Sequence, residues 1–426
     1  MTCRGRRGLG SFAAVVGVLL AVVAAACGGS SKSTGSGTAN SGSSGGSGAA
    51  TKSPYRIGLV YPGTGSAADT YTGVVRAAQA RLDVLNASGG INGHPVELVK
   101  ADDQSSPTGN VTATQQLMSQ GVLVLMQISP FTFASTRVMH AAGLPVVGSG
   151  TDAPEWGMQP NTNMFSLQTT LWDPKLPQYG LPPEIWRGAT SVATFGYGVS
   201  PASADAAKGF AFAAKHAGIR VGYLNDSLPF GTVNATSLAL AMKQQHVDGA
   251  YLPLDVGTNL AILTAAAQAG VHFKVAESGT GYGQALLDNP SARQVAQGVY
   301  FVVQGTPVED KTPGTIAMTN AFAQYSHYTG VPDYGWYEGW ESADLAIEGI
   351  RVAGNNPTRS SIVDNLRKVT HYDAGGLLAS PADFTKFGQD PRTGCFWWAK
   401  LQGSTFVSAS GAKPLCSALL PNSNQA

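Results

Sequence analysis

The stretch Asn86-Ala-Ser-Gly-Gly-Ile-Asn-Gly93, followed closely by Val96-Glu-Leu-Val99, decides how this chain folds. Glycines at this density mark a turn, and the short apolar run after them is typical of a strand. Residues 71–86, before the turn, carry apolar side chains along one helical side, and residues 56–61 form an apolar run that Pro62 ends. A strand, a helix, a glycine-rich turn and a second strand in this order predict a βαβ unit with parallel strands.

The same alternation continues along the chain, which predicts an α/β fold with two doubly wound parallel sheets. Further strands are predicted near 122–126, 145–147, 191–195, 220–224, 250–254, 273–276 and 299–303. Four helices are predicted to open with Ser-Pro or Asp-Pro, where the first residue caps the helix, at Ser106, Ser129, Asp173 and Ser200. From Ala374 the pattern changes, and residues 395–401 and 405–407 predict an antiparallel hairpin.

Length and charge restrict the class of protein. The chain has 426 residues, a formal net charge of +1, and only 12% charged residues. Such a balance offers no basic face for a nucleic acid. About 370 residues remain beyond the N-terminal segment, more than one compact core usually holds, so we expect two lobes. The seven histidines are dispersed, and phosphate-loop and nucleophile-elbow motifs are absent, so we expect no metal, no cofactor and no enzyme activity.

The first 54 residues predict export and attachment to a membrane. Arg4, Arg6 and Arg7 precede an apolar run that ends at Ala24-Ala-Ala-Cys27, which is typical of a bacterial lipoprotein signal whose Cys27 receives the lipid. A plain secretory signal or a single membrane span are the alternatives. Residues 28–54 are almost entirely small and polar, so we expect a disordered tether.

Two cysteines remain once the signal region is set aside, Cys395 and Cys416. In an exported chain an even pair predicts a disulfide, and two separate thiols are the alternative.

The stretch from Ile57 to Gly150 resembles the periplasmic binding proteins of the branched-chain amino-acid (Leu/Ile/Val) type. The resemblance rests on residues 86–93, 96–99, Asp102-Asp-Gln104, Pro107, Gly143-Leu-Pro145 and Ala153-Pro-Glu155, with matching spacing. It implies a type I solute-binding fold: two lobes joined by three crossovers, with a ligand cleft between them and hinge closure over the ligand. It also implies that residues 55–172 with 304–372 form the first lobe and residues 173–303 with 373–426 the second.

The resemblance implies where a ligand binds. The family's carboxylate-binding serine falls on Ser129, with Phe131 close by. Gly150, Thr151 and Asp152 form the loop after the fourth strand, where Asp152 replaces the usual hydroxyl residue. A carboxylate there repels an anionic ligand unless it is protonated or turned away, and Thr151 is the alternative contact.

The family's ammonium-binding aspartate falls on Asp173. Together with Asp152, this residue favours a cation, an amine or a polyhydroxyl compound, and capping of a helix is the alternative role for Asp173.

Candidate ligand contacts in the second lobe follow its strands. Ser200 comes after the strand 191–195 and is expected to face the cleft from the side opposite Ser129. The family's stacking aromatic falls near Asp255, so the aromatic residue type is not kept. Other aromatic residues stand on candidate loops, where packing is the alternative to ligand contact: Tyr197 and Tyr282 above all, then Trp156, Trp172 and Phe230.

These observations predict an extracytoplasmic, lipid-anchored and monomeric solute-binding component of an ABC importer. Its expected partners are a small polar molecule such as an amino acid or a related compound, a membrane permease, and the lipid bilayer through Cys27. A ligand-sensing receptor domain of the same fold is the main alternative, and an exported α/β enzyme is a further one.

Overall fold

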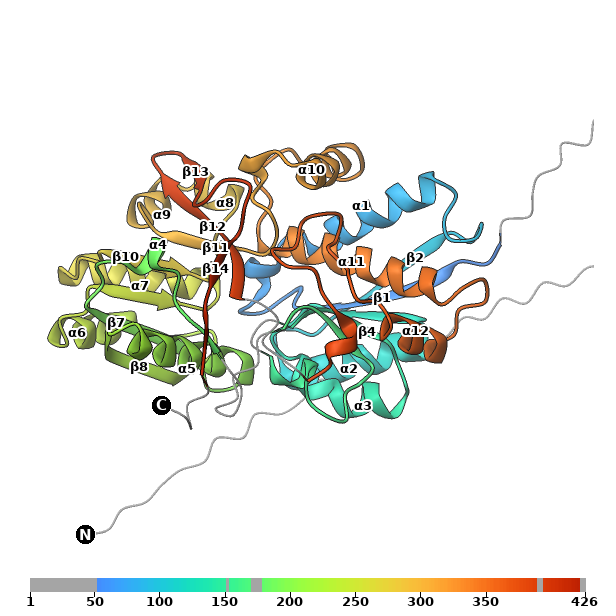
Figure 1. Ribbon diagram of the computed structural model, residues 1–426, viewed down its shortest axis with the longest axis horizontal. Helices are drawn as coiled ribbons and strands as arrows, with labels where there is room; N and C mark the ends of the chain where they lie inside the picture. The colour runs from blue at the N-terminus through green and yellow to red at the C-terminus, as the bar shows by residue number, and fades with distance from the viewer. Residues whose placement is uncertain (1–51, 151–152, 170–177, 389–393, 422–426) are drawn as a thin grey trace, which may run out of the picture. The chain divides into compact units, whose positions relative to one another are not determined.

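The computed structural model describes residues 52–150, 153–169, 178–388 and 394–421, which form two α/β lobes (Figure 1). The first lobe is built on a sheet of five parallel strands in the order β2-β1-β3-β4-β5. The strands are β1 (Tyr55–Tyr61), β2 (Val96–Asp102), β3 (Val124–Gln127), β4 (Val146–Gly150) and β5 (Met164–Thr169).

Helices cover both faces of this first sheet, as a doubly wound fold requires. The helices α1 and α11 lie side by side over one face, and α2 and α3 cover the other (Figure 1). The α-helices of this lobe are α1 (Val74–Ala87), α2 (Pro107–Ser119), α3 (Thr136–Ala141), α10 (Pro313–Ser326), α11 (Tyr334–Val352) and α12 (Arg359–Leu366). Short 3-10 turns complete it: η1 (Ala68–Tyr71), η2 (Thr132–Ser135), η3 (Pro154–Trp156) and η5 (Phe384–Lys386). A further 3-10 turn, η4 (Val308–Asp310), contacts both α10 and the second lobe's strand β13 (Thr405–Ser408).

The glycine-rich turn after α1 explains why the first βαβ unit forms. The side-chain amide of Asn86 pairs with both backbone groups of Val96, at 2.9 and 2.8 Å, and so ties the end of α1 to the start of β2. Gly90 adopts a φ of 73°, and a Cβ there would lie 2.1 Å from the carbonyl oxygen of His94. Only glycine fits such a turn.

The second lobe is built on a mixed sheet in the order β13-β12-β11-β10-β9-β7-β8, with β14 also paired to β12. The strands are β7 (Ser191–Tyr197), β8 (Arg220–Leu228), β9 (Gly249–Leu252), β10 (Val275–Ser278), β11 (Tyr300–Val303), β12 (Gly394–Gln402), β13 (Thr405–Ser408) and β14 (Leu415–Ser417). The helices are α4 (Pro183–Trp186), α5 (Pro201–His216), α6 (Ala235–Gln244), α7 (Val256–Ala269), α8 (Gln284–Asp288) and α9 (Pro290–Val295). A small separate pair joins β6 (Gln178–Tyr179) to β15 (Leu419–Leu420).

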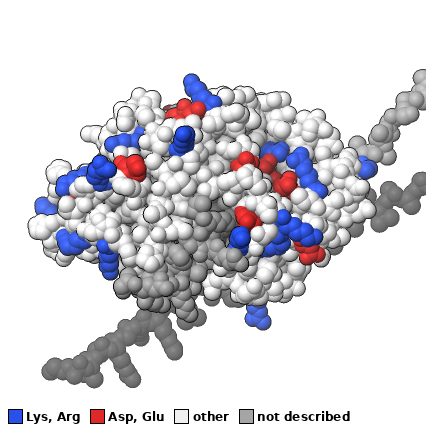
Figure 2. All heavy atoms as spheres, viewed as in Figure 1, with Lys and Arg blue, Asp and Glu red and all other residues white. Residues whose placement is uncertain are grey.

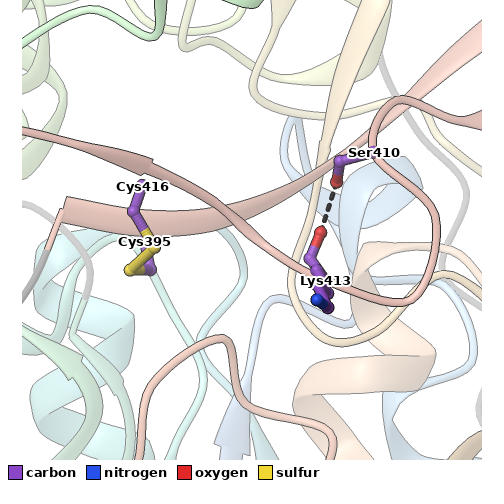
Figure 3. Close-up of a disulfide and its surroundings, with 4 residues drawn as sticks. All are labelled: Cys395, Ser410, Lys413 and Cys416. Carbon is purple, nitrogen blue, oxygen red and sulfur yellow. Dashed lines mark hydrogen bonds between the residues drawn. A yellow bond between two sulfur atoms is a disulfide. The ribbon is translucent and has the colours of Figure 1, made fainter.

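The second sheet is parallel from β7 to β11, as predicted, and the strands of the tail make it mixed. The predicted hairpin of β12 and β13 is confirmed, but it adds to the sheet edge by pairing antiparallel with β11. A hairpin needs only a tight turn, so the tail extends the sheet without a crossover helix. A disulfide between Cys395 and Cys416 joins β12 to β14, as predicted (Figure 3).

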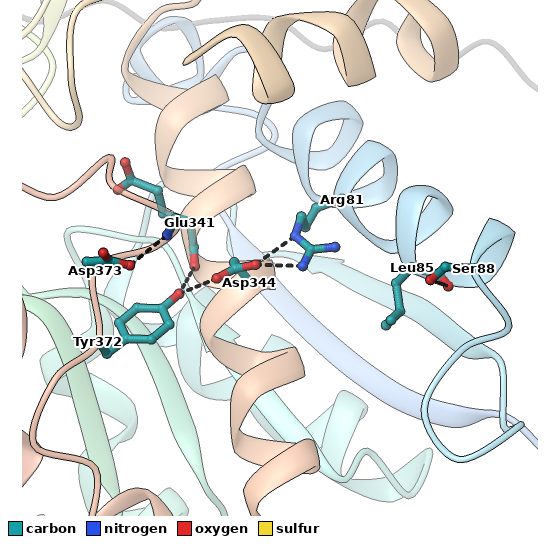
Figure 4. A network of polar contacts seen from close by, with 8 residues as sticks. Arg81, Leu85, Ser88, Glu341, Asp344, Tyr372 and Asp373 are labelled. Carbon is teal, nitrogen blue, oxygen red and sulfur yellow. Dashed lines mark hydrogen bonds and ion pairs between the residues drawn. The ribbon is translucent and has the colours of Figure 1, made fainter. Parts of the chain in front are cut away.

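Packing places residues 373–388 on the first lobe, whereas the sequence assigned them to the second. Phe384 stacks edge-on against Phe165 of β5, with ring centroids 5.5 Å apart. Arg367 Nη1 also donates to the carbonyl oxygen of Phe384, at 3.1 Å. Nearby, Tyr372 and Arg81 of α1 both bond to the Asp344 carboxylate on α11 (Figure 4). The chain therefore stays with the first lobe until after residue 388.

Two of the predicted helix starts are seen, and one differs. Ser106 caps α2 and Ser200 caps α5, each by accepting a backbone N–H of the first turn, with proline following. Ser129 does not cap a helix: Pro130 precedes a 3-10 turn that begins at Thr132, and the Ser129 hydroxyl accepts the N–H of Phe131 instead. Asp173 lies outside the described residues, as do the predicted signal, Cys27 and nearly all of the tether.

Candidate binding cleft

A cavity of about 190 Å³ lies where the carboxyl ends of strands from both sheets meet. The first lobe contributes residues 128–130 after β3 and Ala153, Glu155 and Trp156 after β4. The second contributes residues that end β7 or follow β9 and β10. In open α/β sheets this edge is where ligands bind, because loops and helix starts gather there. The space holds several water molecules and hence a small organic ligand.

On the first-lobe wall, Ser129 is already engaged with a buried carboxylate. Its hydroxyl donates to Asp103, which is fully buried and also accepts from the Asn110 side chain at 3.1 Å and from the Ser105 N–H at 2.9 Å. Burial raises the pKa of Asp103, and these hydrogen bonds partly offset that rise. The Ser129 hydroxyl also accepts the Phe131 N–H at 3.1 Å. Because its single hydrogen is donated to Asp103, it has none left to donate to a ligand.

On the second-lobe wall, Asp255 gathers donors at the start of α7. It caps that helix by accepting the Thr258 N–H at 3.0 Å, and it accepts the Thr258 hydroxyl at 2.7 Å. The hydroxyl of Tyr197 donates to the same carboxylate. Burial, and then the negative charge of Asp255, raise the pKa of Tyr197, so the phenol stays protonated.

Contacts across the cleft join the two lobes beside the cavity. The Ser200 hydroxyl donates to the carbonyl oxygen of Pro130 at 3.3 Å. The N–H of Val256, at the start of α7, donates to the Thr70 hydroxyl at 3.2 Å. Phe230 packs edge-on against Phe131, with ring centroids 5.1 Å apart. The described arrangement therefore has the lobes in contact around the cavity.

The cavity wall is aromatic and acidic. Six aromatic residues line it: Tyr71, Trp156, Tyr197, Phe230, Tyr251 and Tyr334. Three carboxylic acids line it as well, Glu155, Asp255 and Glu338. Burial raises the pKa of Glu155 to about 7, and the nearby Asp205 adds to the rise. Among the described lining residues there is no Lys, Arg or His.

Four of the ten proposed contacts meet at this cavity: Ser129, Tyr197, Ser200 and Asp255. The further aromatic candidates Trp156 and Phe230 line it as well, and Trp172 lies outside the described residues. Phe131 lies behind the wall, fully buried against Phe230. Gly150 ends β4, and Thr151, Asp152 and Asp173 lie outside the described residues.

Tyr282 lines a second cavity of about 310 Å³, and its hydroxyl donates to Glu309 at 2.7 Å. Of the ten proposed contacts, it is the one placed at a different cavity.

Sequence reasoning missed Tyr71, Tyr251, Glu155 and Glu338. Glu338 is almost fully buried in α11, far along the chain from the motifs that marked the cleft. Tyr71 stacks edge-on against Tyr334, with ring centroids 5.4 Å apart, and burial followed by the charge of Glu338 raises its pKa. No local pattern separates these residues from ordinary core positions. Within the described ranges, no cluster of side chains suits a metal ion, and no helix is long and apolar enough to cross a bilayer.

The chain belongs to the periplasmic binding protein family, of the branched-chain amino-acid type, whose model matches residues 54–405. An amino acid binding protein of Pseudomonas aeruginosa is 30% identical over 114 residues, 26% of this chain and 30% of that protein. A Leu/Ile/Val-binding protein homolog 3 of Brucella melitensis is 36% identical over 66 residues, 16% of this chain and 18% of that protein. The chain thus spans less than a third of the length of either relative.

Solved structures show the same fold at low sequence identity. A fatty acid ABC transporter substrate-binding protein from Thermomonospora curvata aligns with a TM-score of 0.68 and 17% identity, over 86% of this chain and 92% of that one. A branched-chain amino acid transporter substrate-binding protein from Streptococcus pneumoniae, in complex with isoleucine, gives 0.67 and 18%, over 85% and 99%. A benzoate complex of a solute-binding protein from R. palustris gives 0.65 and 17%, over 87% and 99%. These structures establish the type I two-lobed fold.

Proposed function

We propose that this chain is the extracytoplasmic solute-binding component of an ABC importer. It binds a small polar molecule in the cleft between its lobes and presents it to a membrane permease. The chain acts as a monomer without catalysis, and it is held at the membrane by a lipid on Cys27. Membership of a family of substrate-binding proteins supports this function.

The observation that carries the proposal is the cavity itself. Its walls come from the carboxyl ends of strands in both sheets, so a bound ligand contacts both lobes at once. A ligand held in this way stabilises the arrangement in which the lobes touch, because its contacts are lost when they separate. The hydrogen bonds from Ser200 to Pro130 and from Val256 to Thr70 also stabilise the arrangement in which the lobes touch. The ligand therefore shifts a hinge equilibrium towards a closed form, which is the form offered to the permease.

Thermal melting of the purified full chain tests ligand binding. The compounds are amino acids, amines, polyols, sugars and aromatic acids. A ligand present at about 100 times its dissociation constant adds about 2.7 kcal/mol to the free energy of unfolding and visibly raises the melting temperature. One class of compound is expected to do so. An unchanged melting temperature with every class of compound would contradict solute binding.

The membrane protein that responds to the ligand-loaded chain distinguishes a transport function from a sensing function. If the chain serves an importer, its ligand-loaded form stimulates ATP hydrolysis by the cognate permease complex in vesicles, and the ligand alone does not. Stimulation of a membrane kinase in place of an ATPase would favour the receptor function.

Membrane attachment through Cys27 is tested by fractionation. The Cys27→Ser variant is expected to leave the membrane pellet, because a lipidated cysteine supplies the apolar anchor. A variant that stays in the pellet would favour a membrane-spanning N-terminus.

A further inference from the structure

We propose that the ligand of this cavity is an organic cation, a small molecule that carries an ammonium group and no carboxylate. This inference rests on the proposed solute-binding function and names its ligand class. The observations behind it are the direction of the hydrogen bonds in the wall, the charge of the wall, and its aromatic character.

Five of the nine hydroxyl groups in the described wall donate their hydrogens to oxygens inside the protein. In each case the partner is a carbonyl or carboxylate oxygen, which only accepts, so the direction of the bond is settled. Five lining hydroxyls are engaged in this way: Ser129 to Asp103, Tyr197 to Asp255, Ser200 to Pro130, Ser203 to Pro253, and Thr280 to Leu254. Four of these oxygens also accept one protein N–H, so what remains for a ligand is the second lone pair of each oxygen and no hydrogen to donate. A ligand that itself donates hydrogen bonds suits such a wall, and a carboxylate does not.

The helix starts beside the cavity are capped from within. At α5, Pro201 has no N–H, and the Ser203 N–H is directed at the Ser200 hydroxyl. At α7, Asp255 accepts the Thr258 N–H, and the Val256 N–H goes to Thr70. Helix N-termini attract anions through unused N–H groups and the helix dipole. Here a protein carboxylate already occupies the start of α7, which removes the usual reason for an anionic ligand to bind there.

The charge of the wall points to the same ligand class. Asp255 and Glu338 line the cavity, Glu338 is only 1% exposed, and the described lining contains no basic side chain. An ammonium group beside Asp255 is attracted by the charge of that carboxylate, and its N–H groups suit the acceptor oxygens of the wall. The rings of Tyr71, Tyr197 and Tyr334 add to the attraction, since a cation within reach of an aromatic face is held by the ring's quadrupole.

Isothermal titration of the full chain with matched compounds tests this ligand class. Choline is compared with its neutral carbon isostere 3,3-dimethyl-1-butanol, so that the two differ chiefly in charge. Putrescine represents primary amines, isoleucine the zwitterions and benzoate the anions. We expect choline or putrescine to bind at least about tenfold more tightly than the neutral, zwitterionic and anionic compounds. Preference for choline indicates recognition by the rings, and preference for putrescine indicates hydrogen bonding to the acceptors.

The charge of Asp255 is tested by the Asp255→Asn variant, which keeps a side-chain oxygen to cap α7. Affinity for the ammonium compound is expected to fall about tenfold or more. The matched control is Asp248→Asn: that residue precedes β9 at the end away from the cavity, and it too accepts backbone N–H groups. The control is expected to leave affinity unchanged.

Two outcomes overturn the inference. The first is tighter binding of isoleucine or benzoate than of any ammonium compound, which contradicts the ligand class but leaves solute binding intact. The second is no binding of either ammonium compound. If the wider melting panel then identifies another ligand, the proposed function stands without this inference; if that panel is silent, both fail.

Discussion

Asp103 and Asp255 occupy similar places in the two lobes, but Asp103 is enclosed by protein donors whereas Asp255 borders the cavity. Each follows a strand of its sheet, and each accepts a hydroxyl from a residue at the end of another strand, Ser129 or Tyr197. Asp103 is fully buried and surrounded by donors. Asp255 has donors on one side and the cavity on the other. A carboxylate enclosed by donors holds loops together, whereas one with an open side can also meet a ligand.

The largest expected effect on stability is at Asp103. The Asp103→Ala variant leaves the Asn110 amide, the Ser105 N–H and the Ser129 hydroxyl without their acceptor in a buried site. We expect a loss of about 3–5 kcal/mol in the free energy of unfolding, measured by urea denaturation. The Asp103→Asn variant, which keeps one oxygen, is expected to lose less. A loss below about 1 kcal/mol for the alanine variant would contradict the structural role.

The second sheet, unlike the first, has antiparallel strands at one edge, and the disulfide joins two of them, β12 and β14. Replacing both Cys395 and Cys416 by Ser is expected to cost about 2–4 kcal/mol, since the bond closes a loop of 21 residues. Ligand affinity should not change, because neither cysteine lines the cavity. The control is Ser410→Ala in the same tail, where the hydroxyl donates to the Lys413 carbonyl at an exposed site (Figure 3). A double variant as stable as the control would show that strand pairing alone holds this edge.

Glu277 in β10 is a third carboxyl group, and it is buried away from the cavity. Burial raises its pKa to about 7, although the Trp186 indole N–H donates to it at 2.9 Å. Between about pH 4.5 and 7 the unfolded chain releases this proton and the folded chain keeps it, so the contribution to stability falls as pH rises.

The Glu277→Gln variant is therefore expected to lack a decline of about 1–3 kcal/mol that the native chain shows between pH 5 and 8. Melting temperatures of both proteins across this range measure the difference. Parallel curves would place the pKa of Glu277 near its ordinary value.

The smallest expected effect is at Asp248, a partly exposed carboxylate with the opposite pKa shift. Hydrogen bonds from Lys274, Ser191 and Thr190 lower its pKa to about 2, against the opposing effect of burial. Its stabilisation is present above about pH 4 and is lost as pH falls towards 2. Asp248→Asn should cost about 1–2 kcal/mol at neutral pH and flatten the acid limb of the stability profile. An unchanged acid limb would contradict this assignment.

The few charged side chains are spread thinly over the molecule. Most of the face drawn in Figure 2 carries neither acidic nor basic side chains, in keeping with the 12% of charged residues in the chain. Individual exposed pairs such as Arg56 with Glu97 add little to stability. The carboxyl groups with the larger expected effects on stability are the buried ones, such as Asp103 and Glu277.

The sequence predicted those features that depend on residues close together in the chain. The strand before Pro62, the α1 helix and the turn at Gly90 follow from short-range periodicity and turn chemistry, and the structure confirms them. Ser129, Tyr197, Ser200 and Asp255 were chosen because they end or follow strands, and all four line the cavity. Their roles as ligand contacts stay predictions.

The direction of the hydrogen bonds was out of reach of sequence reasoning. Whether the Ser129 hydroxyl faces a ligand or donates to Asp103 depends on two side chains 26 residues apart that meet only in the folded chain. Glu338 enters the cavity wall from a helix that carries no cleft motif.

The sequence by itself determined the alternation of strands and helices, the family and the edge of the sheets where the cavity lies, because hydrophobic period, turn residues and helix caps are local properties. Only the tertiary structure decided that residues 373–388 pack on the first lobe, that the tail extends the second sheet, and that the cavity wall is rich in acceptors. Those features arise from contacts between residues far apart in the chain, whose energies depend on which groups become buried together.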